Sequence, residues 1–392
     1  MLSKLAAPGQ DTTEPSTSGE RPRPLAPRTR RLIAAVVGVI VIIAALSSLI
    51  ILTDQSKDKI KIGVMIGPSS TFSHSTEVKA ALEMAVNSIN KWGGIGLEDV
   101  ELVIKETLAD NASVSAAFAE IEETHHPLFY VTIGCELISL LGPLVEDAKV
   151  PLVGMGLAPE LTEGFNWTFR FYVSADGEAA VATNLLRNLE VTSLGVLYSM
   201  NPHGCGVNDA LVDEFSAAGG AVESDGFESE EDLYESISNL LDNEAIFAVG
   251  SCSEIGPMIS DIKNHSYEGH ILVASCGSIP QMWELPQMEG VYVSAPLIYR
   301  EENIYAREFM ESFENTYAIT PTHHGAVAYD ILYLVQGLMI DHDLTRENLK
   351  EQLDGGFIFS GVVGILRIDA GEHDFDLSVF SAVISEGGLR YL

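Results

Sequence analysis

Basic side chains are scarce in this sequence of 392 residues. It has 22 lysines and arginines against 56 aspartates and glutamates, a formal net charge of −34 at pH 7. Residues 1–31 carry six basic and three acidic side chains, a net of +3, so the rest of the chain carries −37. So acidic a body repels nucleic acid and anionic lipid, and we expect no nucleic-acid partner. The acids are scattered, which favours a solvated acidic shell; steering of cationic ligands is the alternative.

Cysteine is also rare, with four residues of which Cys135 is the first. No two cysteines have the close spacing that zinc and iron–sulfur sites usually show, so the sequence predicts no metal and no cofactor. The motifs GxxxxGK, HExxH and GxSxG are absent, and no general base is visibly paired with a nucleophile. We therefore do not expect an enzyme.

Long apolar runs are rare too, and the longest is residues 32–52, "LIAAVVGVIVIIAALSSLIIL". A helix of this length spans roughly 30 Å, the thickness of a bilayer core. We predict a retained transmembrane helix; a cleaved secretory signal, whose apolar region is usually shorter, is the alternative. The absence of a cysteine before Cys135 excludes a lipid-anchoring cysteine directly after this segment.

The residues around the apolar segment predict its orientation. Residues 1–31 are rich in Pro, Ser, Thr and Arg and are expected to form a disordered tail. Arg28, Arg30 and Arg31 lie immediately before the span, which predicts a cytoplasmic N-terminus. The linker 53–58 would then hold an extracellular or periplasmic body, residues 59–392, close to the cell membrane.

From residue 59 onward, apolar segments of strand length alternate with amphipathic helical patterns. Strands are predicted at 59–66, 100–105, 128–133, 151–153, 194–198, 245–249, 271–274 and 291–295. Such repeated β-α units with nearly continuous apolar strands are typical of parallel sheets covered by helices on both faces. An extended segment at 169–173 divides the pattern, so we predict an α/β protein with two doubly wound lobes.

In doubly wound sheets, ligands bind beyond the carboxyl ends of the strands. Facing lobes would bring six such loops around one cleft. These loops are residues 67–74, 135–139, 154–157, 199–206, 251–254 and 275–277.

Several segments, in their order along the chain, together resemble a known protein family. They include "IKIGVMIGP", "INKWGGIG", "VPLVGMGLAPELTEGFNWTFRFYVSADGEAA", "LGVLYSMNPHGCG" and "FSGVVGILRIDAGEHDF". Over about residues 59–392 the chain resembles the type I periplasmic (solute-)binding proteins, in particular the branched-chain amino-acid-binding (Leu/Ile/Val-binding) group of ABC transporters. The resemblance implies a small organic ligand captured by hinge closure. It also implies delivery to an ABC transporter permease, with sensing without transport as the alternative.

The resemblance further implies two Rossmann-like lobes joined by three crossovers. These are expected near Val173, near 295–300 and near 355–361. Lobe one would comprise about 58–173 plus 300–356. Lobe two would comprise 174–299 plus 357–392.

The resemblance also suggests ligand-binding residues in lobe one. Phe72 lies where relatives often have an aromatic residue over the ligand. Cys135 and Glu136 occupy the loop that presents a hydroxyl in relatives, and Ser139 would supply that hydroxyl if the loop is shifted. Glu136 faces either the ligand or the solvated rim. Met155, Gly156 and Leu157 match a loop that binds amino acids, but Leu157 replaces its threonine.

Lobe two supplies further candidates. Tyr198 ends a strand, and His203 stands where relatives have a tyrosine that stacks on the ligand. Ser251 and Cys252 lie in the next loop. Cys276 falls where amino-acid binders keep a carboxylate for the ligand's ammonium group. Since Leu157 and Cys276 alter both halves of that clamp, we expect a ligand other than a standard α-amino acid.

All four cysteines lie on predicted rim loops, and extracellular cysteines tend to pair. Cys252 and Cys276 follow consecutive strands, so a disulfide between them is plausible, with Cys205 as a competing partner. A bridge from Cys135 to lobe two would lock the cleft. Free thiols in a reducing setting are the alternative.

Overall fold

The computed structural model describes residues 59–68, 74–299 and 302–392. The predicted tail at 1–31, the apolar span at 32–52, the linker at 53–58 and Phe72 lie outside these described residues. Within the described ranges, no helix combines the length and the apolar character needed to cross a bilayer.

Lobe one is built on a six-stranded parallel sheet with the order β13-β5-β4-β3-β1-β2. Its strands are β1 (Ile60–Ile66), β2 (Val100–Glu106), β3 (Phe129–Ile133), β4 (Leu152–Met155), β5 (Thr168–Tyr172) and β13 (Asp374–Asp376). Its helices are α2 (Ser75–Lys91), α3 (Asn111–His125), α4 (Cys135–Ala148), α10 (Ile304–Tyr317), α11 (His323–Leu338) and α12 (Arg346–Asp354), with a 3-10 turn η1 (Pro159–Leu161). A hairpin of β11 (Phe357–Gly361) and β12 (Gly364–Ile368) packs against α11.

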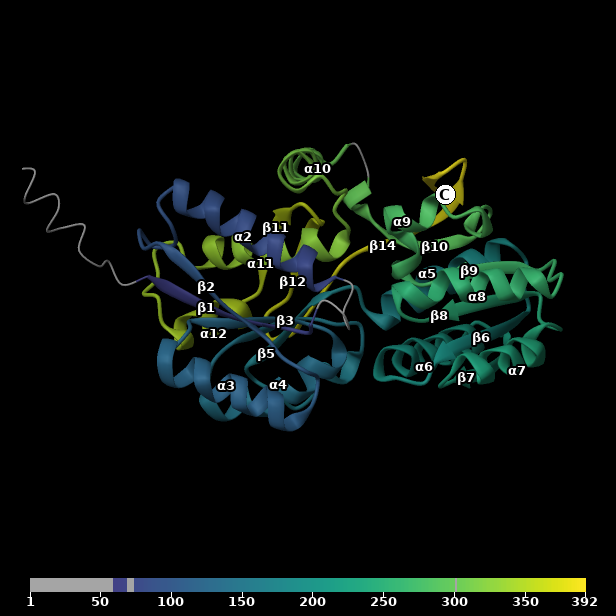
Figure 1. Ribbon diagram of the computed structural model, residues 1–392, viewed down its shortest axis with the longest axis horizontal. Helices are drawn as coiled ribbons and strands as arrows, with labels where there is room; N and C mark the ends of the chain where they lie inside the picture. The colour runs from purple at the N-terminus through teal and green to yellow at the C-terminus, as the bar shows by residue number, and fades with distance from the viewer. Residues whose placement is uncertain (1–58, 69–73, 300–301) are drawn as a thin grey trace, which may run out of the picture. The chain divides into compact units, whose positions relative to one another are not determined.

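Apolar residues on alternate strand positions cover both faces of this sheet. In β1, Ile62 and Val64 pack with residues of α2 and α11. Met65, the next residue, packs on the opposite face with α3 and α4, together with Tyr130 of β3. Figure 1 shows these two pairs of helices on opposite sides of the strands. Side chains alternate along a strand, so a strand buried on both faces must be apolar throughout.

Lobe two contains a seven-stranded sheet with the order β15-β14-β10-β9-β8-β6-β7. Its strands are β6 (Ser193–Ser199), β7 (Ala221–Phe227), β8 (Ala245–Val249), β9 (His270–Val273), β10 (Tyr292–Pro296), β14 (Val379–Ser385) and β15 (Gly388–Tyr391). Its helices are α5 (Ala175–Asn188), α6 (Pro202–Ala217), α7 (Glu230–Leu240), α8 (Cys252–Asn264) and α9 (Pro280–Trp283), with 3-10 turns η2 (Ser275–Ser278), η3 (Pro286–Met288) and η4 (Leu297–Tyr299). β14 runs antiparallel to β10 and β15, and the other pairs are parallel.

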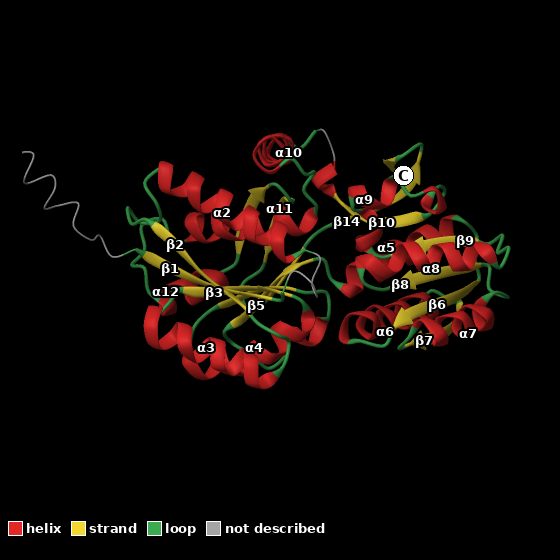
Figure 2. Cartoon of the chain, in the orientation of Figure 1, coloured by secondary structure: helices red, strands yellow, loops and turns green. Residues whose placement is uncertain are grey.

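The second sheet is also covered on both faces, as Figure 2 shows. Val196 of β6 and Phe247 of β8 pack with residues of α5 and α6. Leu197 and Ile246, their chain neighbours, pack with α7 and α8 on the other face. The prediction of two α/β lobes with helix-covered parallel sheets is thereby confirmed.

The chain passes between the sheets three times. It leaves β5 for α5 around Val173, leaves β10 for α10 after Pro296, and returns from β13 to β14 between Asp376 and Val379. The sequence placed the third passage near 355–361 and assigned 357–392 to lobe two, which is wrong for residues 357–376.

Two buried polar contacts explain the later position of this third passage. The Asp330 carboxylate of α11 accepts the N–H groups of Val362 and Val363, at 3.0 and 2.8 Å, and so holds the β11–β12 turn on lobe one. Arg170 of β5 is buried, and its guanidinium donates to Asp374 (2.8 Å) and Asp376 (2.5 Å) of β13. A buried guanidinium must be paired, so β13 is fixed beside β5.

We expect Asp330→Ala to lower the free energy of unfolding by about 2–4 kcal/mol, because it leaves two buried N–H groups without an acceptor. Urea denaturation of the variant and the native chain measures the difference. Asp343→Ala, which removes an exposed carboxylate, is the matched control and should change stability by less than about 0.5 kcal/mol. Equal losses for both variants would show that Asp330 does not hold the hairpin.

Candidate functional site

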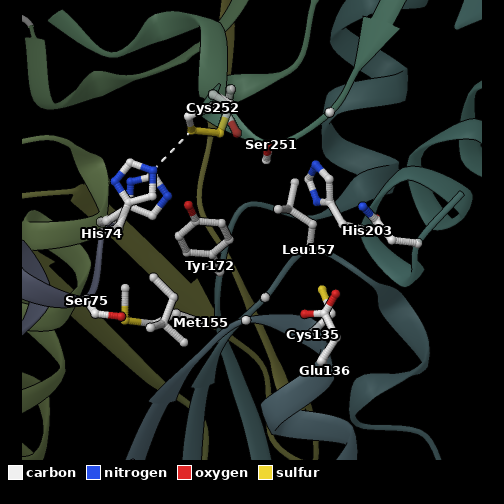
Figure 3. Close-up of a pocket in the computed structure, with 18 of the residues that line it drawn as sticks. His74, Ser75, Cys135, Glu136, Met155, Leu157, Tyr172, His203, Ser251 and Cys252 are labelled. Carbon is white, nitrogen blue, oxygen red and sulfur yellow. Dashed lines mark hydrogen bonds between the residues drawn. A yellow bond between two sulfur atoms is a disulfide. The ribbon is translucent and has the colours of Figure 1, made fainter. Parts of the chain in front are cut away.

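A cavity of about 400 Å³ lies between the carboxyl ends of the strands of the two lobes. Lobe one lines it with His74, Ser75, Ile133, Gly134, Cys135, Glu136, Met155, Gly156, Leu157, Tyr172 and His324. Lobe two lines it with Asn201, His203, Gly250, Ser251, Cys252, Ser253, Ser275 and Cys276. Figure 3 shows these side chains converging on one space.

The strand order places the cavity at a switch point of each sheet. In lobe one, β1 lies between β2 and β3, and the chain turns to α2 after β1 but to α4, on the other face, after β3. In lobe two, β6 and β8 are neighbours and lead to α6 and α8 on opposite faces. Connections that diverge in this way leave a crevice at the sheet edge, which is where ligands bind in doubly wound sheets.

Five helices begin at the cavity. Their first or second residues line it: Ser75 (α2), Cys135 (α4), His203 (α6), Cys252 (α8) and His324 (α11). The first turn of a helix has N–H groups without intrahelical acceptors and carries the positive end of the helix dipole. At α11 the N–H groups of His324 and Gly325 are already accepted by Thr322 and Glu77, and at α6 that of Gly204 is accepted by Asn201. The backbone donors left for a ligand are first-turn N–H groups outside these caps.

The side chains around the cavity carry little charge. No lysine or arginine is among the lining residues, all of which are described, and Glu136 is their one carboxylate. Burial lowers the pKa of His74 and of His203 to about 4, and lowers the pKa of His324 well below its ordinary value. These imidazoles are uncharged at neutral pH and act as hydrogen-bonding groups.

A buried carboxylate positions the histidine pair of lobe one. Glu77 of α2 accepts the N–H groups of Thr322 (2.6 Å) and Gly325 (2.9 Å), which caps the start of α11. The Thr322 hydroxyl lies 2.9 Å from Nδ1 of His324. The rings of His324 and His74 stack with centroids 3.7 Å apart and planes 6° from parallel. Glu77 thus fixes α2, α11 and both rings relative to one another.

In the cavity wall formed by β4 and α4, the backbone at Gly156 lies very close to neighbouring side chains. A Cβ on Gly156 would lie 2.7 Å from Leu161 and 2.8 Å from Ile138. Cys135 begins α4 and is buried, and its burial raises the pKa of the thiol. Only a glycine at position 156 allows α4 to pack this closely behind the cavity.

In lobe two the walls are also set by helix starts. The Asn201 side chain accepts the N–H of Gly204 at 2.9 Å and so caps α6 ahead of His203. Glu254 accepts the N–H of Ser251 (2.7 Å) and the hydroxyl of Ser199 (3.0 Å), so it supports the α8 turn.

A disulfide joins Cys252, the first residue of α8, to Cys276 in η2, with Cα atoms 5.1 Å apart. It connects the ends of β8 and β9 within lobe two. Cys135 is a buried free thiol and Cys205 a partly buried one, so neither takes part in this bridge. The Cys252 sulfur faces lobe one, where His74 Nε2 lies 3.2 Å away.

Residues 59–388 match the family model described as periplasmic binding protein. The chain belongs to this family. The match covers the described body except its last four residues and includes both lobes and all three passages between them.

Individual periplasmic binding proteins resemble the chain more distantly. A chemotactic signal transduction substrate-binding protein, BasB of Halobacterium salinarum, is 23% identical over 239 residues, which are 55% of this chain. The match spans 56% of the length of that curated relative, little more than half.

Two solved structures share the type I fold. The leucine-binding protein LivK of Thermotoga maritima superposes with a TM-score of 0.75 at 21% identity, over 85% of this chain and 97% of that one. A solute-binding protein of an ABC transporter from Rhodopseudomonas palustris, solved with 3,4-dihydroxybenzoic acid, gives 0.75 at 14% identity, over 86% and 96%.

The structure places most of the candidate residues of this binding protein at the cavity. Cys135, Glu136, Met155, Gly156, Leu157, His203, Ser251, Cys252 and Cys276 line it. Ser139 does not, because its hydroxyl donates to the carbonyl of Cys135 one helical turn earlier. The expected loop at 135–139 is in fact the start of α4. Tyr198 is not a lining residue either and stands against Gly226.

Several lining residues were not among the candidates. The most prominent are His74, Tyr172, Asn201, Ser275 and His324. Asn201 could have been found as the N-cap residue of α6, since asparagine is a common helix cap. His74 is the last residue of the expected rim loop 67–74. Tyr172 ends β5 beside the first passage between lobes, and His324 lies in the first turn of α11, which Glu77 holds to α2.

A second buried carboxylate provides a pH-dependent test of the site. Glu178 of α5 accepts the N–H of Ser275 at 3.0 Å, and burial raises its pKa to about 7. Because the pKa of Glu178 is higher in the folded chain than its ordinary value of 4.5, protonation of this carboxyl favours the folded state. This contribution to stability is complete below pH 4.5 and is lost as the pH rises through 7.

We therefore expect Glu178→Gln to match the native chain in stability at pH 5 and to exceed it by about 1–3 kcal/mol at pH 8, where the native carboxylate is charged. The amide keeps an oxygen for the Ser275 N–H. Thermal or urea unfolding at the two pH values measures the difference. A constant difference between pH 5 and pH 8 would contradict the assigned burial.

Proposed function

We propose that this periplasmic binding protein captures a small organic ligand, amino-acid-like or related, in the cavity between its lobes. The observation that carries the proposal is the position of the cavity, which lies at the switch points of both sheets and takes lining residues from both lobes. A ligand there contacts both lobes fully only when they are close together. Its differential affinity then shifts the population towards the closed form by hinge motion.

The lining favours a ligand with several hydrogen-bond acceptors. First-turn N–H groups that the caps of α6 and α11 do not already occupy supply backbone donors for carboxylate or carbonyl oxygens, and no lysine or arginine is among the described lining residues. Uncharged His203 and the carboxylate of Glu136 would pair with donor groups of the ligand. Ile133, Met155 and Leu157 supply apolar contact with its hydrocarbon part.

We further propose that the ligand is not a standard α-amino acid. Leu157 offers no hydroxyl where the amino-acid binders have threonine, and Cys276 is held in a disulfide where they keep a carboxylate. The R. palustris protein solved with 3,4-dihydroxybenzoic acid supports a wider range of ligands on this fold.

Delivery to the permease of an ABC importer is our leading proposal for the next step, with residues 32–52 as the membrane anchor and the body outside the cytoplasm. The solute-binding protein named for an ABC transporter supports this proposal. The relative named for chemotactic signal transduction supports the second candidate, a sensor that signals without transport. Permease and ATPase genes beside this gene would favour delivery.

A thermal-shift screen of the full chain with amino acids, aromatic acids and small amides tests the ligand class. A ligand at 100 times its Kd stabilises the folded state by about 2.7 kcal/mol. We expect the largest shift from an organic acid or amide. If leucine, isoleucine or valine gave the largest shift, the proposed ligand class would be wrong.

Ser253→Trp tests whether the cavity is the binding site, because Ser253 is an exposed lining residue in the first turn of α8. An indole there fills the cavity, and we expect the best ligand of the screen to lose at least about 1.4 kcal/mol, a tenfold higher Kd by calorimetry. Ser238→Trp, on the exposed surface of α7, is the matched control and should leave Kd unchanged. Unaltered binding by Ser253→Trp would place the site elsewhere.

A further inference from the structure

Four potential metal ligands from four separate segments meet at one end of the cavity. They are His74 and His324 of lobe one and Cys252 and Cys276 of lobe two, and one ligand atom of each lies within 4.8 Å of the others. His74 Nε2 is 3.2 Å from the Cys252 sulfur, and Figure 3 shows the ring edge directed at the disulfide. The ligand-capture function proposed above assigns no role to this cluster.

Hydrogen bonds orient His324 as a metal ligand. The Thr322 hydroxyl has one proton, which it donates to the Glu77 carboxylate at 2.9 Å. Its oxygen therefore accepts from Nδ1–H of His324, and the lone pair of Nε2 is left unprotonated. A histidine held through its other nitrogen by a carboxylate-linked group is the usual outer-shell arrangement of metal-binding imidazoles. The rings of His74 and His324 are stacked with planes 6° from parallel. An imidazole binds a metal ion in its own ring plane, so the His74 ring must turn out of the stack before both histidines can bind one ion.

We propose that reduction of the Cys252–Cys276 disulfide converts this cluster into a Cys₂His₂ site for Zn²⁺ that ties the two lobes together. Two thiolates and two imidazoles form a standard tetrahedral zinc set, with Zn–S about 2.3 Å and Zn–N about 2.0–2.1 Å. Such a tetrahedron separates its ligand atoms by roughly 3.3–3.8 Å. One ligand atom of each residue lies within 4.8 Å of the others, and the two sulfurs, bonded to each other in the disulfide, can move apart to this spacing once their bond is broken.

The chemistry balances with an external reductant. A phosphine and one water convert the disulfide into two thiols and a phosphine oxide. Zn²⁺ then binds the two sulfurs as thiolates and releases two protons. Because each lobe supplies two ligands, the bound ion crosses the cleft and holds the lobes close together. The oxidised chain, with no thiolate to offer, lacks half of the ligand set.

The test is a metal titration of the full chain in mild detergent, with and without a phosphine reductant. The reduced chain should bind one Zn²⁺, measured by elemental analysis after gel filtration and by competition with a chromogenic chelator. Co²⁺ in its place should give the strong visible absorption of a tetrahedral ion and thiolate-to-cobalt charge transfer. The oxidised chain should show neither signal.

Two ligand variants and two controls identify the residues. His74→Gln and Cys276→Ser should weaken Zn²⁺ binding by more than about 100-fold, beyond the 10–100-fold cost of outer-shell changes. Cys205→Ser and His342→Gln remove a thiol and an imidazole outside the cluster and should bind as the native chain does. His74→Gln leaves the disulfide intact, so its oxidised form serves as the check that the variant folds.

Four results would overturn the proposal. The first three are a reduced chain that takes up no zinc, an oxidised chain that binds it equally well, and a His74→Gln variant that binds with native affinity. A reduced chain that unfolds and is not restored by zinc would count against it in the same way. Each result leaves ligand capture in the cavity of the oxidised chain untouched.

Discussion

The divergence of the chain after neighbouring strands is the constraint on which the binding cavity depends. After β1 and β3, and again after β6 and β8, the connections leave for opposite faces of the sheet. The connections diverge because both faces of each sheet are apolar, and helices must cover each face. The edge between two such strands is left without covering side chains. The starts of five helices lie there, and three chain passages bring the two edges together.

Buried carboxylates turn this general geometry into a defined site. Glu77, Glu178 and Asp330 each accept backbone N–H groups from a segment distant in the sequence. Burying a carboxylate is costly, and these hydrogen bonds offset part of the cost. These hydrogen bonds fix the positions of three segments relative to core helices. The segments are the start of α11, the turn that carries Cys276 and the β11–β12 hairpin.

The sequence predicted the elements with strong local patterns. The β-α alternation, the two helix-covered sheets and most of the rim loops were all readable from apolar periodicity and helix caps. The missed unit, β7 with α7, is an edge strand whose exposed polar residues do not alternate with apolar ones. The first turn of α4 was predicted as part of the rim loop 135–139, because Cys135 and Glu136 looked like loop residues.

Long-range pairing accounts for the other errors. Asp330 looks like an ordinary helix acid, and nothing near it in the sequence indicates that it holds Val362 and Val363. The third passage between lobes was misplaced for this reason. The approach of His74 and His324 to the disulfide depends on the fold of both lobes, so cysteine spacing alone gave no sign of a cluster.

Hydrogen–deuterium exchange of the full chain, with and without the best ligand of the screen, tests the central claim most directly. If the ligand is held between the lobes, the first turns of α4 in lobe one and of α6 and α8 in lobe two will gain protection together. Protection of one lobe alone, or of neither, would contradict capture in the cavity.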